Sequence, residues 1–453
     1  MRGLANRRVR PKPTPFDVPY DDNVIGVRHD DGTLLTVLAV HGSTPGPRPL
    51  AEPWRPAAGS KLSVAGGLPW DTLTAWSRRP EALATEISVL THGRSTGDDG
   101  PAARAYRSLL GPLSVAGERA VHLVVRFAPL AHPEWVARYG TGRSAALRAV
   151  LAATRTMTAL LRADGLTVTG RTAAELTALT GKIPPVASAV IHSAVSQSAV
   201  IHYSVHPDDP AHLPTALESV WQHGAAASTA LVWRTGPAGP VIRASACIDR
   251  SLDGQLRDDL PPGWRPRPSD AANADRATLP RSTATALAGT VIPVTGAGIV
   301  VGADPTGRPV TVRLAGPDVA IAEVTGGLPT AQRVVVRLAA LGISSAIFTD
   351  RPERWDGVLH GVRDRHLVHP AASGAADVLI DDRPDGQLGP LARHTVIRVR
   401  EQGHPVPGIP GLYPDPEDPA NILISGARTP LRVRLVSTPA EDALLSPRNA
   451  PTD

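Results

Sequence analysis

The stretch DVAIAEVTGGLPTAQRVVVRLAALGISSAIFT, residues 318–349, carries the clearest structural pattern in the chain. It predicts a strand over 318–324, a turn at Thr325-Gly326-Gly327, a helix over 329–341 and a second strand over 345–349. A proline near the predicted helix start and a glycine at its end agree with the usual punctuation of helices. Strand, crossover helix and strand make a βαβ unit, so the two strands should run parallel with a right-handed connection.

Two strands of this region end in Asp-Arg-Pro, one at Asp350 and the next, predicted over 377–380, at Asp382. Ligands of open α/β sheets bind beyond the carboxyl ends of the strands. Asp350 and Asp382 are therefore candidates to hold Mg²⁺ or a sugar hydroxyl, and Gly326 and Gly327 are candidates to cradle a phosphate at a helix N-terminus. The alternative is structural, because aspartates also terminate strands through their own hydrogen bonds. The structural alternative is favoured, since neither G-x-G-x-x-G nor a Walker A motif accompanies the glycines.

The N-terminal half predicts a mixture of strands and helices. Runs over 24–28 and 33–40 flank an Asp-Gly turn and predict a β-hairpin. The apolar run 120–127 is typical of a strand covered on both faces. Residues 143–164 have helical apolar spacing, and Thr172-Ala173-Ala174-Glu175 has the form of a capping box.

The fold class predicted from these elements is α/β (mixed α+β), with an N-terminal mixed-sheet domain covered by short helices and a smaller C-terminal domain that contains the parallel βαβ unit. The predicted segments are a basic juxtamembrane-like tail at 1–14, an N-terminal α/β domain at 15–254, a Pro-rich linker at 255–284, a C-terminal α/β domain at 285–437 and a disordered tail at 438–453.

Composition excludes several classes of protein. The chain has 453 residues, of which 42% are hydrophobic and 20% charged, so it is globular and long enough for two or three domains. With 41 glycines and 46 prolines, a coiled coil is excluded. One cysteine excludes an intramolecular disulfide and a Cys-rich metal site. Gly93-Arg94-Ser95-Thr96-Gly97 matches G-x-S-x-G, but no helix follows it directly, so we predict no catalytic serine there. We also predict no other catalytic residue, no metal site and no cofactor.

The net charge of +5 is concentrated in the first twelve residues, at Arg2, Arg7, Arg8, Arg10 and Lys12. Outside them, 42 basic residues balance 42 acidic ones, so the body lacks the excess that a nucleic-acid-binding face needs. The tail fits an anionic lipid surface. Its alternative is a solvated terminus. No apolar run predicts a membrane span in the chain as given.

Several short segments, taken in order, resemble the EccE family. In the N-terminal half these segments are PFDVP (15–19), SVLTHGR (88–94), YRSLLGPL (106–113) and VVRF (124–127). In the C-terminal half they are the glycine turn with its helix (326–342) and TDRP (349–352) with Trp355.

The resemblance implies a core subunit of the type VII (ESX) secretion machinery, a non-catalytic scaffold at the cytoplasmic face of the cell membrane. Its partners would be the EccB, EccC and EccD components. It also implies two N-terminal transmembrane helices, which do not precede ANRRVRPK (5–12) in this sequence. The basic tail would then lie against the membrane. The alternative function is a nucleotide- or sugar-nucleotide-binding, degenerate transferase-like domain that uses the two glycines and two aspartates named above.

Overall fold

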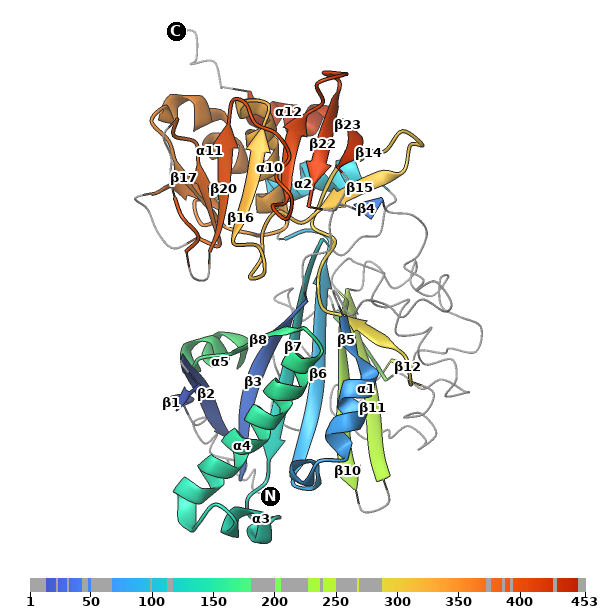
Figure 1. Ribbon diagram of the computed structural model, residues 1–453, viewed down its shortest axis with the longest axis vertical. Helices are drawn as coiled ribbons and strands as arrows, with labels where there is room; N and C mark the ends of the chain where they lie inside the picture. Colours follow the sequence, from blue (N-terminus) through green and yellow to red (C-terminus); the bar gives the residue numbers. More distant parts are fainter. Residues whose placement is uncertain are drawn as a thin grey trace, which may run out of the picture.

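The computed structural model describes residues 14–21, 23–30, 32–42, 48–49, 67–97, 100–111, 117–180, 200–204, 227–236, 239–249, 267–268, 287–371, 376–384, 388–391, 394–426 and 430–446. They form two lobes, each built on one large sheet (Figure 1). The predicted class, mixed α and β, is confirmed.

The first lobe is built on a ten-stranded sheet within the described residues, in the order β1-β2-β3-β7-β6-β10-β11-β9-β12, with β8 beside β3. The strands are β1 Phe16–Tyr20, β2 Asn23–Asp30, β3 Thr33–His41, β6 Thr85–Arg94, β7 Glu118–Phe127, β8 Thr167–Gly170, β9 Val200–Ser204, β10 Ala227–Gly236, β11 Gly239–Asp249 and β12 Arg267–Pro268. Each described pair is antiparallel, and β2 and β3 form the predicted hairpin.

Helices α1 (Trp70–Ser77) and α4 (Gly142–Ala163) cover one face of this sheet, and α5 (Ala173–Thr180) lies on the other (Figure 1). The predicted helix over 143–164 is therefore confirmed as α4. Buried threonine pairs join α4 to the sheet, with Thr36 Oγ1 2.7 Å from Thr154 Oγ1. The predicted capping box begins α5, because the Glu175 carboxylate accepts from the Thr172 N–H at 2.7 Å. The short strands β5 (Gly67–Pro69) and β13 (Val291–Pro293) pair beside this lobe.

The second lobe is built on an eleven-stranded mixed sheet within the described residues, in the order β18-β17-β19-β20-β16-β21-β22-β23-β14-β15-β4. Its strands are β4 Arg48–Pro49, β14 Ile299–Ala303, β15 Pro309–Val312, β16 Ile321–Thr325, β17 Ser345–Phe348, β18 Val368–Pro370, β19 Val378–Asp381, β20 Thr395–Arg400, β21 Gly411–Pro414, β22 Asn421–Ser425 and β23 Leu431–Leu435. The pairs from β18 to β21 are parallel and the remainder antiparallel.

The βαβ unit is confirmed as β16, helix α10 (Leu328–Ala340) and β17, and its two strands run parallel. They are not neighbours, however, because β19 and β20 lie between them. The chain therefore crosses two strand positions before it re-enters the sheet.

Two short helices of the C-terminal part of the chain pack beside α10 in the second core. Helix α11 (Asp356–Val362) follows the 3-10 turn η4 (Pro352–Trp355), and α12 (Pro439–Leu445) packs on α10 and α11. The prediction that 438–453 is a disordered tail is wrong for α12, because its Glu441 is only 2% exposed. Thr438 caps α12 by accepting from the Glu441 N–H, so this segment has a local start signal as well as a tertiary contact.

The two cores exchange segments. Helix α2 (Pro101–Leu110) leaves the first sheet after β6 but packs in the second core through Ala102, Tyr106 and Leu110. In return, Leu287 and the β13 region pack in the first core. Apart from β12, the predicted linker at 255–284 lies outside the described residues.

Candidate functional site

The carboxyl edge of the parallel strands in the second lobe holds the best-defined polar cluster among the predicted residues. Asp382 directly follows β19 and is 3% exposed. Its carboxylate accepts from Arg351 at 2.7 and 3.2 Å, from Trp355 Nε1 at 2.8 Å and from Thr349 Oγ1 at 2.9 Å. Burial alone raises the pKa of Asp382, but these donors outweigh burial and hold the pKa below its ordinary value.

This geometry gives Asp382 a structural role. Its backbone N–H also donates to the Phe348 carbonyl at 2.8 Å, so the residue joins the ends of β17 and β19. Four donor contacts occupy the carboxylate, and the ion pair with Arg351 raises the pKa of the guanidinium. A carboxylate already held by its own chain has little capacity left for a metal ion or a hydroxyl.

The other predicted ligand residues are dispersed along this edge. Asp350 is exposed and ends β17, next to the Asp382 strand. Gly326 and Gly327 follow β16, with φ of 100° and 94°, and β20 separates β16 from β19. At about 4.8 Å per strand, the glycine turn is about 10 Å from the β19 end. The structure thus brings the aspartates to neighbouring strands and leaves the glycines apart from them.

A buried ion pair that the sequence patterns did not reveal lies behind this sheet. Arg337 of α10 donates to Glu441 of α12 at 2.6 and 2.8 Å, and both residues are 2% exposed. The same guanidinium donates to the carbonyls of Val300, Val301 and Val436 at 2.6 to 3.1 Å. An arginine within the apolar run VVVRLAALG was the available signal. All the described hydrogen bonds of the Arg337 guanidinium are made to residues of the second lobe, so the ion pair stabilises the fold of that lobe.

Two histidines, the buried His122 and the half-buried His41, lie on the α5 side of the first sheet. Burial, with a smaller contribution from the charge of Arg171, lowers the pKa of His122 to about 3 and that of His41 to about 4. Arg171 is itself paired with Glu175 at 2.9 Å. Both imidazoles are thus neutral at physiological pH.

The junction between the lobes is a set of close backbone contacts. The Gly97 N–H donates to the Ala340 carbonyl at 2.6 Å, and the Gly298 N–H donates to the Gly117 carbonyl at 2.9 Å. A Cβ on Gly97 would lie 2.9 Å from the Gly342 backbone N. Gly97, the last glycine of the G-x-S-x-G pattern, therefore allows the backbones of the two lobes to come into contact.

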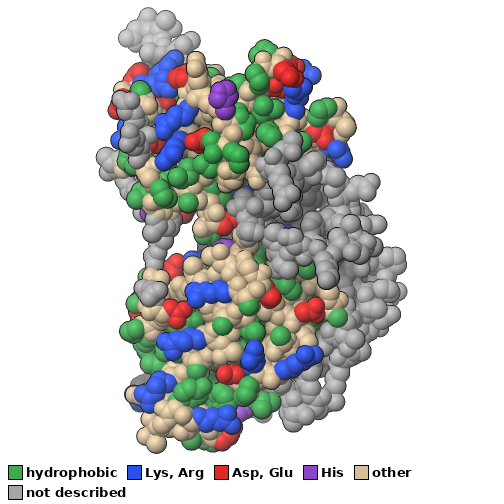
Figure 2. Space-filling view, in the orientation of Figure 1, with side chains coloured by type: hydrophobic (Ala, Val, Ile, Leu, Met, Phe, Trp, Pro, Cys, Tyr) green, Lys and Arg blue, Asp and Glu red, His purple; other side chains and the backbone are tan. Residues whose placement is uncertain are grey.

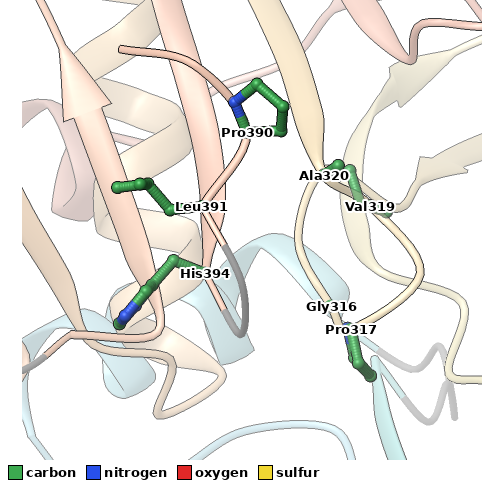
Figure 3. Close-up of a pocket in the computed structure, with 7 residues that line it drawn as sticks. All are labelled: Gly316, Pro317, Val319, Ala320, Pro390, Leu391 and His394. Atoms are coloured by element: carbon green, nitrogen blue, oxygen red, sulfur yellow. The ribbon is translucent and has the colours of Figure 1, made fainter. Parts of the chain in front are cut away.

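A small pocket of about 270 Å³ opens at the opposite, amino edge of the parallel strands (Figure 3). Its lining is Gly316, Pro317, Val319, Ala320, Pro390, Leu391 and His394. His394 is the one titratable side chain in this lining, and its Nδ1 lies 2.7 Å from the Ala376 carbonyl. This apolar lining offers no acid–base pair.

The basic tail residues Arg2, Arg7, Arg8, Arg10 and Lys12 lie outside the described residues. In the part of the chain that the structure describes, no three His, Cys, Asp or Glu side chains are placed to hold a metal ion. Among the same residues, no helix has the length and apolar character to cross a bilayer.

The fold and its polar clusters define a two-lobed α+β protein in which one predicted ligand residue, Asp382, joins the ends of two strands. Residues 115–189 match the family described as "Putative type VII ESX secretion system translocon, EccE". That segment runs from β7 through α3 (Pro133–Ala137), α4 and β8 to α5. The resemblance to the EccE family inferred from the sequence is thereby confirmed over this segment. No curated protein matches the chain.

Proposed function

We propose that the chain is a non-catalytic structural subunit of a type VII secretion complex, working through protein–protein contacts on the cytoplasmic face of the membrane. The observation that carries this proposal is the EccE match over 115–189, which covers helix α4 and two of the strands that it packs on, β7 and β8. By family resemblance, the partners are the EccB, EccC and EccD components.

The state of the buried charges supports a scaffold. Asp382 is held by Arg351, Thr349 and Trp355, and Arg337 is held by Glu441. Side chains whose donors and acceptors are already used within the fold have little hydrogen-bonding capacity left for a substrate. Here the well-placed charges are used between elements of the same lobe.

The proposal is tested by purification of the tagged full chain from membranes of its own cell, in mild detergent. We expect the other core subunits of the secretion complex to co-purify, and we expect deletion of the gene to abolish secretion of the substrates of that system. Complementation by the wild-type chain is the positive control. Normal secretion without the gene, or purification of the chain alone, contradicts the proposal.

The nucleotide-binding alternative is tested in parallel by thermal shift with nucleotides and nucleotide sugars in the presence of Mg²⁺. A ligand at 100 times its Kd would stabilise the folded chain by about 2.7 kcal/mol. A shift of that size, removed by D350N, would favour the alternative over the scaffold.

A further inference from the structure

The end of the first lobe that points away from the second lobe has an unusual surface. Strands β6 and β7 run between the two ends of this lobe, with Thr85 paired to Phe127 at the far end. Their other ends, Arg94 and Glu118, lead to the junction with the second lobe. Ten residues of strand place the far end about 33 Å from that junction. We call this far end the tip.

Two leucines project from the tip into solvent. Leu83 ends the 3-10 turn η1 (Pro80–Leu83), two residues before β6, and it is 62% exposed. Leu130 lies three residues after β7 and is 87% exposed. They are the two most exposed large hydrophobic residues of the described chain, and strand pairing puts them at the same end of the sheet. Scattered single apolar residues are ordinary on a surface, but these two share one end with a basic cluster.

The basic cluster consists of exposed arginines on the segments around these leucines. Its members are Arg78, Arg79, Arg138, Arg143 and Arg148. Within the described residues none of the five forms an ion pair: Arg138 lies 4.5 Å from the centre of the Trp135 ring, and Arg148 donates to the Tyr139 carbonyl. The acids at this end include Asp30, which pairs with Arg28 at 3.0 Å, the half-buried Glu81 and the exposed Glu134, whereas helix α4 contains no acidic residue. Figure 2 shows basic, acidic and hydrophobic side chains interspersed over the lower lobe.

The chain also enters the fold from the tip side. Phe16, the first residue of β1, pairs with Val27, close to the end of β2 that turns into β3 at the tip, whereas Tyr20 pairs with Asn23 at the opposite end. Strand β1 therefore begins on the tip side of the sheet. Phe16 itself is 45% exposed.

We propose that the tip, defined by Leu83, Leu130 and the five arginines, docks on an anionic phospholipid surface. The arginines supply attraction to lipid phosphates, and the leucines enter the boundary between headgroups and acyl chains. Membrane binding of this kind scales with the buried apolar area plus the attraction to anionic lipids, so the leucines and the arginines act together. The inference rests on the proposed membrane function and adds the surface through which the lobe meets the bilayer.

The test is flotation of the full chain with vesicles of phosphatidylglycerol and phosphatidylcholine, compared with phosphatidylcholine alone, at low and high salt. We expect binding to the anionic vesicles that weakens with salt. R78Q/R79Q should lower the partition coefficient about 5-fold for each arginine at low salt. L83S/L130S should lower it about 10-fold with less dependence on salt.

Matched controls come from the second lobe. R354Q/R365Q removes two exposed arginines, and L391S removes a leucine that is 46% exposed. Both should bind like the wild type, and unchanged melting temperatures verify that each variant is folded. Equal binding to neutral vesicles, or tip variants that bind like the controls while replacement of the five N-terminal charges abolishes binding, would overturn the inference.

The outcome also separates this inference from the proposed function. Tip variants that keep vesicle binding but lose the co-purifying secretion subunits would show that the tip meets a protein rather than lipid, which overturns the inference and leaves the scaffold intact. If the wild-type chain binds vesicles through the tip but no secretion subunit co-purifies with it, the proposed function is overturned and the inference about the tip stands.

Discussion

Replacement of Arg337 by methionine is the sharpest test of how the second lobe is held together. Arg337 and Glu441 join α10 to α12, and the chain between them includes most strands of the second sheet. Methionine keeps most of the apolar volume of the side chain and removes its charge and donors. The perturbation therefore acts on the ion pair and spares most of the packing around it.

The expected cost follows from burial. Both side chains of the pair are 3% exposed or less, so the variant leaves the Glu441 carboxylate in the core without its donors. Breaking a buried pair by removal of one partner costs about 3–5 kcal/mol. The carbonyls of Val300, Val301 and Val436 also lose a donor. We therefore expect R337M to lower the free energy of unfolding of the second lobe by about 4 kcal/mol.

The same two helices provide the control. Arg333 of α10 pairs with Asp442 of α12 at 3.0 Å, but these side chains are 23% and 48% exposed. R333M should cost less than about 1 kcal/mol, because exposed ion pairs contribute little. Urea unfolding followed by circular dichroism gives the free energies, and hydrogen exchange of the peptide that contains α12 localises the loss. A cost for R337M no larger than that for R333M would refute the reasoning.

Three further predictions concern the carboxyl edge, the histidines and the junction. D382N should lower the unfolding free energy by about 2–3 kcal/mol, because charged hydrogen bonds are lost in a buried place; a variant of unchanged stability that lost nucleotide-sugar binding would contradict the structural role. His41 and His122 have pKa values of about 4 and about 3 in the folded chain, against about 6.5 in the unfolded chain. Below pH 6.5 the unfolded chain therefore binds protons that the folded chain does not. Stability should thus fall by about 2 kcal/mol for each between pH 7.5 and pH 5, as urea midpoints will show, and H122N should remove about half of the fall. G97A should destabilise by about 1–3 kcal/mol in thermal unfolding because its Cβ meets backbone, whereas G389A, where a Cβ has open space, should cost at most a few tenths of a kcal/mol, since surface substitutions away from special features usually lie within about 0.5 kcal/mol.

Local patterns predicted local structure well. The βαβ unit, the β2–β3 hairpin, α4 and the capping box at Thr172 each depend on residues within about thirty positions of one another. The same locality explains what was missed. Nothing in residues 318–349 states that β19 and β20 enter between β16 and β17, because that order is set by packing among strands distant in the sequence.

The candidate site shows the same division. Asp382 was correctly placed at the end of a strand, but its donors Arg351 and Trp355 come from the turn that follows a different strand. Only the folded sheet brings them together. Glu441 was missed for another reason. Thr438-Pro-Ala-Glu441 is a visible capping pattern, but the helix that follows is too short to be stable by itself. It forms because it packs on α10.

Helix α2 gives the two lobes a fixed relation, which matters for any scaffold. It leaves β6 of the first sheet and buries Tyr106 and Leu110 in the second core, and the Tyr106 hydroxyl accepts from the Val300 N–H at 2.7 Å. Withdrawal of α2 would expose these side chains at about 1.5–3 kcal/mol each and leave the buried Val300 N–H without its acceptor. The Gly97 and Gly298 backbone contacts add to that cost. Separation of the lobes is therefore expensive, so a partner that binds the second lobe is held at a defined distance and angle from the tip of the first.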